Sequence, residues 1–161
     1  MDRKGLFVLP SATLAAILLV AGISNPALAQ APKAPTLETD IDGVSAEVTE
    51  AVRREGVLTI KLRYRNAGSA PAKVRFTDGS GGVDKFYVVA GSTKMLPLKD
   101  SKGVALMTPL DNHGNLNAEI RPNGSFLFWA KYPAPPDSAK KISIYTPHGP
   151  PVEDVPITEA K

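Results

Sequence analysis

The chain has 161 residues, of which 43% are apolar, with no cysteine and a formal net charge of +3. The lack of cysteine excludes stabilisation by disulfides and also excludes blue-copper sites, which need a thiolate ligand. The small charge excess does not indicate a nucleic-acid-binding protein, because such proteins carry a strongly basic surface.

The first 29 residues have the pattern of a secretory signal peptide. The basic residues Arg3 and Lys4 precede an apolar run over residues 6–23, and a small-residue cleavage site follows at residues 27–29. Cleavage is therefore expected before Gln30. The alternative is a membrane anchor, because the apolar run is about as long as a spanning helix. Its internal proline and hydroxyl residues, and the lack of a charged stop-transfer flank, favour cleavage.

Removal of the signal peptide takes away two basic residues and one acidic residue, so the net charge falls from +3 to +2. The remaining chain has the length of one domain and is long enough to bury a core without disulfides. We expect an exported protein, periplasmic or extracellular, that is not membrane-integral after signal cleavage. The sequence leaves its oligomeric state open.

Residues 30–42 combine prolines with polar residues and have little apolar periodicity, which predicts a flexible tether. Alternation of apolar and polar side chains, the pattern of a half-buried strand, begins at Val44. The alternation is clearest from Leu58 to Tyr64, where every second residue is apolar. A turn is expected at residues 66–71, where asparagine, glycine and proline occur together.

Further short strands follow, each bounded by residues that favour turns. They are expected at residues 73–76, 86–90, 94–98, 116–120, 125–132 and 141–146, before a proline-rich tail at residues 147–157. About seven or eight short strands without a helical apolar stripe predict an all-β sandwich or barrel. We place this domain at residues 43–158.

Four stretches of the chain resemble a known group of domains. Residues 58–71 (LTIKLRYRNAGSAP) are similar to the second strand and turn of immunoglobulin-like domains in exported bacterial proteins. Residues 87–103, 125–136 and 144–157 resemble a group within this class that occurs alone or beside OmpA-like peptidoglycan-binding domains. The resemblance implies an immunoglobulin-like antiparallel β-sandwich. It implies no activity and no functional residues.

Two short motifs resemble pieces of enzymes but lack their partners. Residues 78–82 (DGSGG) differ in order from the serine motif of trypsin-like proteases, and both histidines follow the serine. Residues 138–141 fit a Ser-x-x-Lys pattern without the companion motifs of acyl-transferring enzymes. We therefore expect no catalytic residue, no cofactor and no enzymatic activity.

Metal binding is the next class of function that the sequence can be tested for. The soft ligands of a Cu(I) site lie on separate predicted loops and strands; they are His113, His148, Met95 and Met107. Calcium prefers hard oxygen donors, and the chain offers Asp78, Asp84 and Asp111 near glycine-rich loops. Their spacing matches no known calcium loop, and aspartates in turns commonly serve only as turn formers. No metal site is therefore assigned, and these aspartates are weak candidates.

A small-ligand or calcium-type metal-binding periplasmic protein is nevertheless the alternative function. Its site would be formed by the loops at residues 78–84 and 111–115. Convergence of these two loops at one end of the fold, with their oxygens pointing inward, would favour this alternative.

A basic set lies on the solvent-facing sides of two successive predicted strands: Lys61, Arg63, Arg65, Lys73 and Arg75. A solvated surface is the favoured interpretation of such residues, and in a sandwich the two strands can belong to different sheets. If the set is contiguous, an anionic envelope polymer or a phosphorylated lipid surface is the natural partner.

The strand at residues 125–132 is apolar on both faces, with Leu127 and Trp129 opposite the side that carries Phe128. Only one face of a strand in a two-layer sandwich belongs to the core. Trp129 is therefore either covered by the proline-rich tail or exposed as an interface anchor. The leading hypothesis is a non-catalytic extracytoplasmic interaction module that binds an envelope protein or polymer.

Overall fold

The computed structural model describes residues 35–77 and 82–160. The predicted signal peptide, residues 1–29, and Asp78 lie outside the described residues. The described chain contains eleven β-strands, one short 3-10 helix and no α-helix, which confirms the all-β class. All strand pairings are antiparallel except one.

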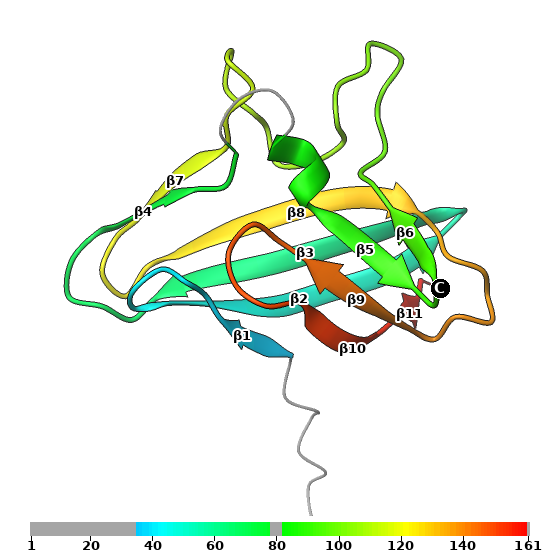
Figure 1. Ribbon diagram of the computed structural model, residues 1–161, viewed down its shortest axis with the longest axis horizontal. Coiled ribbons are helices and arrows are strands. Elements are labelled where there is room, and N and C mark those ends of the chain that lie inside the picture. The colour runs from blue at the N-terminus through cyan, green and yellow to red at the C-terminus, as the bar shows by residue number, and fades with distance from the viewer. Residues whose placement is uncertain (1–34, 78–81, 161) are drawn as a thin grey trace, which may run out of the picture. The chain divides into compact units, whose positions relative to one another are not determined.

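The main sheet is built around a long hairpin, and its long strands run side by side (Figure 1). Its strands, in spatial order, are β1 (Thr36–Glu38), β2 (Val44–Arg54), β3 (Val57–Asn66) and β8 (Ser125–Pro133). The short strand β11 (Thr158–Glu159) pairs in parallel with the end of β2. This arrangement places β3 at the centre, with β2 on one side and β8 on the other.

Two smaller sheets complete the fold. The first has the spatial order β10 (Val152–Pro156), β9 (Lys141–Tyr145), β5 (Tyr87–Ala90) and β6 (Thr93–Met95). The second is a ribbon of β4 (Ala72–Arg75) and β7 (Asn117–Ile120), and the 3-10 helix η1 (Gly82–Lys85) precedes β5.

One hydrophobic core joins the three sheets. The alternating residues of β3 predicted to face inward, Leu58, Ile60, Leu62 and Tyr64, are each 0% exposed. Aromatic rings fill the space above them, with Phe86 stacked on Phe128 at 4.5 Å between ring centroids. The predicted alternation of β3 is therefore confirmed, because a single buried face fixes which side of the strand turns inward.

The turn of the central hairpin consists of Glu55 and Gly56, both with positive φ angles (49° and 77°). Two left-handed residues in a two-residue loop match the twist of the flanking strands, and glycine accepts this conformation without strain. Arg54 pairs directly with Val57 across the turn. Arg53 and Arg54, just before the turn, belong to β2.

The folded domain begins before the predicted boundary at residue 43. Residues 36–38 form β1, which pairs with β2, so this part of the expected tether is a strand. Leu37 is only 6% exposed and joins the core, which explains why the segment is fixed. The strand count exceeds the predicted seven or eight because of β1, β10 and β11. β1 and β11 have only two or three residues, and β10 lies in the proline-rich tail, where no strand was expected.

Candidate interaction face

The main sheet turns one side away from the core. Along β8, Phe128, Ala130 and Tyr132 are buried, whereas Leu127 is 49% exposed and Trp129 is part-buried. This confirms the predicted two-sided apolarity of the strand.

The strand register brings predicted binding residues together on this side. Lys61 lies opposite Trp129, Arg63 opposite Leu127, and Arg65 opposite Ser125. Trp129 is thus a diagonal neighbour of Arg63, within reach of a long side chain. We call this surface the outer face; it consists of Lys61, Arg63, Arg65, Leu127, Trp129 and Lys131, bordered on β2 by Glu47 and Glu50.

The cations of the outer face differ in their partners. Lys61 forms an ion pair with Glu50, and Arg65 Nε lies 3.5 Å from a carboxylate oxygen of Glu47. Within the described chain, neither Arg63 nor Lys131 forms an ion pair. A free guanidinium therefore lies beside an exposed leucine and a part-exposed indole.

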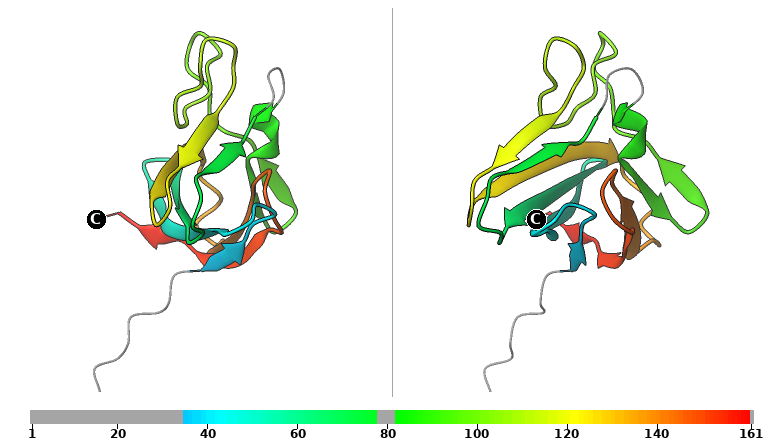
Figure 2. Two further views of the ribbon diagram at one scale, coloured as in Figure 1. Left: turned by 90° about the vertical axis from the view of Figure 1, so that its left-hand side faces the viewer. Right: turned by 60° about the vertical axis from the view of Figure 1, so that its left-hand side comes forward.

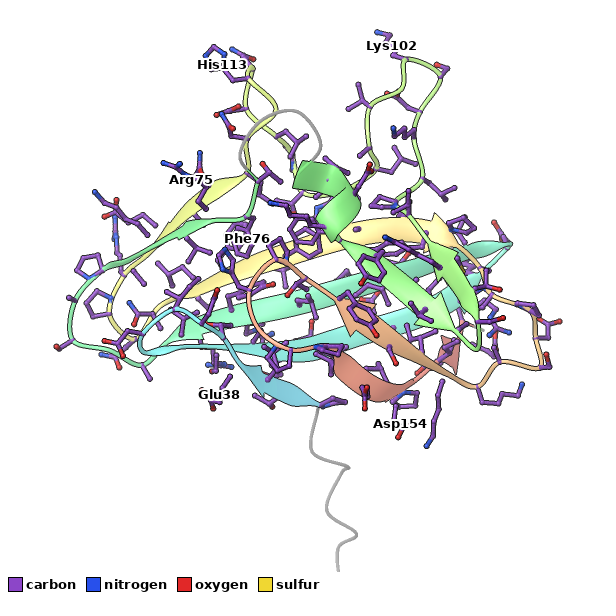
Figure 3. All side chains as sticks on the ribbon, in the orientation of Figure 1. Glu38, Arg75, Phe76, Lys102, His113 and Asp154 are labelled. Carbon is purple, nitrogen blue, oxygen red and sulfur yellow. The ribbon has the colours of Figure 1, made fainter. Side chains whose placement is uncertain are left out.

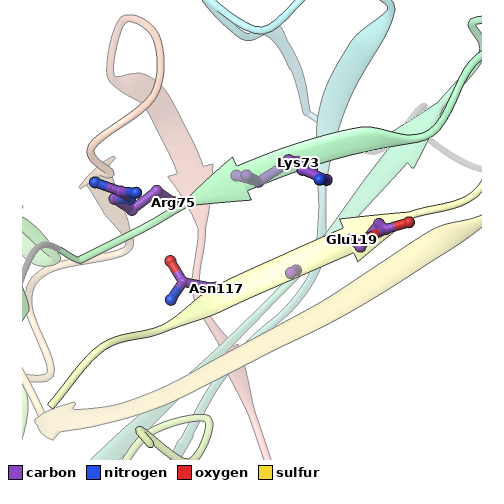
Figure 4. A pocket seen from close by; sticks show the side chains of 6 residues that line it. Lys73, Arg75, Asn117 and Glu119 are labelled. Carbon is purple, nitrogen blue, oxygen red and sulfur yellow. The ribbon is translucent and has the colours of Figure 1, made fainter. Parts of the chain in front are cut away.

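The remaining two predicted binding residues, Lys73 and Arg75, lie on the β4–β7 ribbon. Lys73 is opposite Glu119 and Arg75 is opposite Asn117. Together they line a shallow hollow of about 360 Å³ (Figure 4). The basic set is consequently divided between two sheets.

The proline-rich tail does not pair with β8 within the described residues. Its strands β10 and β11 pair with β9 and β2, and β3 separates β2 from β8. Along the edge of β8 that faces away from β3, the neighbour of Trp129 is the β6–β7 connection. Trp129 N donates a hydrogen bond to Thr108 Oγ1, and Thr108 N donates one to Trp129 O, both at 2.8 Å.

Two loops of the β6–β7 connection contain the same kind of turn. In each, an aspartate side chain accepts hydrogen bonds from the backbone two and four residues later: Asp100 from Lys102 and Val104, and Asp111 from His113 and Asn115. Gly103 and Gly114 take the left-handed position in these turns, with φ of 79° and 76°. Both loops stand at the same end of the fold as η1 (Figure 2).

These contacts define the role of Asp111. Backbone hydrogen bonding from Asn115, assisted by His113, lowers the pKa of the Asp111 carboxyl. Oδ1 accepts from both backbone amides, and Oδ2 accepts from the Asn115 side chain at 3.2 Å. The carboxylate therefore acts within its own turn, as a turn former does.

The other metal candidates are Asp84 and Asp78. Asp84 lies exposed on η1, and Asp78 lies outside the described residues. In the part of the chain that the structure describes, no three His, Asp or Glu side chains are grouped as metal ligands. His113 lies at a loop tip (Figure 3), whereas Met95 and Met107 are 8% and 3% exposed and belong to the core.

Sequence reasoning missed one buried charge. Arg53 is only 6% exposed; its Nη1 lies 3.0 Å from Asp137 and 3.3 Å from Glu159, and its Nη2 donates to Ala139 O at 2.7 Å. These contacts fasten β11 and the turn after β8 to β2. No local signal identifies such a residue, because its partners are more than eighty positions away.

Among the residues that the structure describes, no helix has the length and apolarity needed to cross a membrane. The chain matches no protein-family model, no curated protein and no solved structure. Its function is therefore interpreted from its own residues.

Proposed function

We propose that this protein is a non-catalytic interaction module with an immunoglobulin-like sandwich fold, exported to the periplasm or beyond the cell. Its outer face binds an envelope protein or polymer. The observation that carries the proposal is the register of β3 and β8, which sets Leu127 and Trp129 beside the unpaired Arg63.

Such a combination has the composition of a binding surface. Tryptophan and arginine are the residues most enriched among those that dominate interface energies, because each offers a large apolar area together with a polar group. Leu127 is 49% exposed, and an exposed large apolar residue next to them adds area that a partner can bury. All three stand on paired strands, so little ordering is required upon binding.

Charge favours an anionic partner. The outer face holds four cationic side chains against two carboxylates; the cations are Lys61, Arg63, Arg65 and Lys131, and the carboxylates are Glu47 and Glu50. Both carboxylates are engaged by Lys61 and Arg65, which leaves Arg63 and Lys131 free to meet external negative charge. A positive surface of this kind accelerates association with acidic partners and makes it salt-dependent.

The test compares matched variants of the chain from residue 30 to residue 161. Trp129→Ala combined with Arg63→Gln removes the aromatic and the free cation of the outer face. Lys73→Gln combined with Arg75→Gln removes two cations from the β4–β7 ribbon and serves as the control. We expect crosslinked capture of partners from envelope extract to be lost in the first pair and retained in the second. Equal capture by both would refute the proposal.

One observation supports the alternative of a small-ligand binder. A hollow of about 450 Å³ lies between η1 and the loop that contains Asp100. Its lining includes Val83, Asp84, Lys99 and Val104. Its lining is largely apolar and contains one residue of each charge, so an organic ligand fits it better than a calcium ion. Protection of Val104 from solvent upon addition of a ligand, with Trp129 unaffected, would favour this alternative.

A further inference from the structure

The two free cations of the outer face stand on either side of Trp129. Arg63 lies opposite Leu127, which is two residues from Trp129 along β8. Lys131 is two residues from Trp129 in the other direction and is on the same side of the strand. Because a strand advances by roughly 3.3 Å per residue, each cation is displaced by about 7 Å from Trp129 along the strand axis. The sheet therefore presents a row in which an indole separates two positive charges.

Neither cation of this row is neutralised within the described chain. The ion pairs of the outer face join Lys61 to Glu50 and Arg65 to Glu47. A ligand that meets the row thus gains two charge contacts without breaking an ion pair, and it covers the part-exposed indole between them.

This combination suits a linear saccharide chain that carries carboxylates. A pyranose ring presents C–H groups on its face, and their partial positive charge is attracted to the negative face of an aromatic ring. Carboxylates of the adjoining sugars can accept charge-assisted hydrogen bonds from a guanidinium and an ammonium. We propose that the outer face binds an acidic polysaccharide along β8, with a sugar ring on Trp129 and carboxylates at Arg63 and Lys131. The inference rests on the proposed function and narrows its partner to one chemical class.

The hydrogen bonds at the edge of β8 argue against a peptide in this place. Extended peptides commonly bind by adding a strand to a sheet edge, because their backbone N–H and C=O groups need partners. At Trp129 this edge is occupied, since its N–H donates to Thr108 Oγ1 and its carbonyl accepts from Thr108 N. At Lys131 the N–H donates to Leu106 O and the carbonyl accepts from Leu98 N, both at 2.8 Å. A peptide would lie across side chains with its backbone unpaired, whereas a saccharide chain has no amide backbone.

Composition argues against a folded protein surface and against a membrane. The centre of a protein interface is depleted in charged residues, whereas on β3 and β8 the outer face holds four cations beside only Leu127 and Trp129. Attachment to anionic lipids generally requires a cluster of roughly four to eight cations. Lys61 and Arg65 are already paired with carboxylates, which leaves two cations for an external partner.

The direct test titrates the chain from residue 30 to residue 161 with an unbranched oligosaccharide in which uronic acid alternates with N-acetylhexosamine. Trp129 is the only tryptophan in the sequence, so its emission reports on this site alone. We expect the emission to move to shorter wavelength, because the sugar ring displaces water from the indole. The same oligosaccharide with its carboxylates reduced to alcohols is the matched control. It should bind roughly tenfold more weakly, since two exposed ion pairs are lost.

Variants test the row itself. Arg63→Gln and Lys131→Gln should each weaken binding by up to about fivefold, the range of one exposed ion pair. Lys73→Gln on the β4–β7 ribbon is the control and should leave binding unchanged. A tetrasaccharide with two carboxylates should bind more tightly than a disaccharide with one, but not in Arg63→Gln, where one free cation remains. An advantage of the tetrasaccharide that persists in Arg63→Gln would contradict the row.

Failure of this inference can be told apart from failure of the proposed function. Absence of binding by the oligosaccharide, or equal binding after its carboxylates are reduced, overturns the inference. A response of Trp129 to polyglutamate or to phosphatidylglycerol vesicles in its place would assign the partner to another class and leave the outer face as the binding surface. The proposed function itself fails if capture from envelope extract is equal in the variants of the outer face and of the β4–β7 ribbon.

Discussion

The central strand β3 and the short strand β4 carry the same pattern of exposed cations but give them different surroundings. Lys61, Arg63 and Arg65 alternate along β3, as Lys73 and Arg75 do along β4. β3 lies between β2 and β8, whereas β4 pairs only with β7.

The neighbours decide what these cations can do. On β3 they meet carboxylates on one side and the apolar residues Leu127 and Trp129 on the other. On β4 they are paired with Asn117 and Glu119, which are both polar. An alternating basic strand is therefore a binding candidate only when its register supplies apolar partners on the same face.

The buried sides of the two strands offer the largest test of this difference. Replacing Leu62, which is 0% exposed, by alanine should cost roughly 2–5 kcal/mol in the free energy of unfolding, because it leaves a cavity between sheets. Val74→Ala on β4 should cost less, because fewer atoms are removed. Urea denaturation of both variants measures the two losses. A smaller loss at Leu62 than at Val74 would show that β3 is not the centre of the core.

The hydroxyl of Tyr64 is the next point of contrast, because it is a polar group at the centre of the buried side of β3. It is fully buried and makes no hydrogen bond of good geometry in the described chain, although the Thr146 hydroxyl lies near it. An unsatisfied buried hydroxyl is destabilising, so Tyr64→Phe should raise the free energy of unfolding by about 1 kcal/mol. Thermal denaturation at neutral pH checks this; a marked loss of stability would indicate that the hydroxyl is bound.

The same residue predicts alkaline behaviour. Burial raises the pKa of Tyr64 from 10.0 to about 12, with the nearby Thr146 hydroxyl acting in the opposite direction. The unfolded chain therefore loses this proton at lower pH than the folded chain, and stability falls as pH rises from about 10 toward 12. Tyr64→Phe should reduce this alkaline loss. A denaturation series across that range, with equal slopes in both proteins, would contradict the prediction.

The exposed sides give the smallest difference in stability. Lys61 is paired with Glu50, whereas Lys73 makes no ion pair with Glu119 in the described structure. Lys61→Gln should cost about 0.2–1 kcal/mol at low salt and less at high salt, since exposed ion pairs are weak and screened. Lys73→Gln should leave the free energy of unfolding unchanged. Equal losses in the free energy of unfolding for both variants would contradict the difference between the paired Lys61 and the unpaired Lys73.

Local patterns were sufficient for the long strands. β3 alternates over ten residues, so its buried and exposed sides could be assigned residue by residue. β8 is apolar on both faces, so the sequence divides its residues between two faces but does not show how exposed the second face is. The strands β1 and β11 are too short for any alternation, and only pairing with β2 reveals them. The all-β class follows from the long strands, whereas the domain boundary depends on the short ones.

The candidate site could likewise be predicted only in part from local patterns. Exposure of Trp129 was one of two alternatives, because alternation tells which side of β8 it occupies but not what lies over that side. The grouping with Arg63 and the separation from Arg75 depend on register between distant strands, which no local pattern specifies. The contacts of Arg53, and that of His148 with Asp40, also join distant segments, and for this reason neither residue was singled out as a structural clamp.

The most direct test of the binding face is site-specific photocrosslinking in the cell envelope. A photoreactive residue at position 127 probes the outer face, and one at position 73 probes the β4–β7 ribbon; both positions are exposed. We predict a discrete crosslinked product from position 127 that is absent from position 73 and disappears when Arg63→Glu reverses the free charge. Products from position 73 alone, or a position 127 product unaffected by Arg63→Glu, would contradict the proposed role of the outer face.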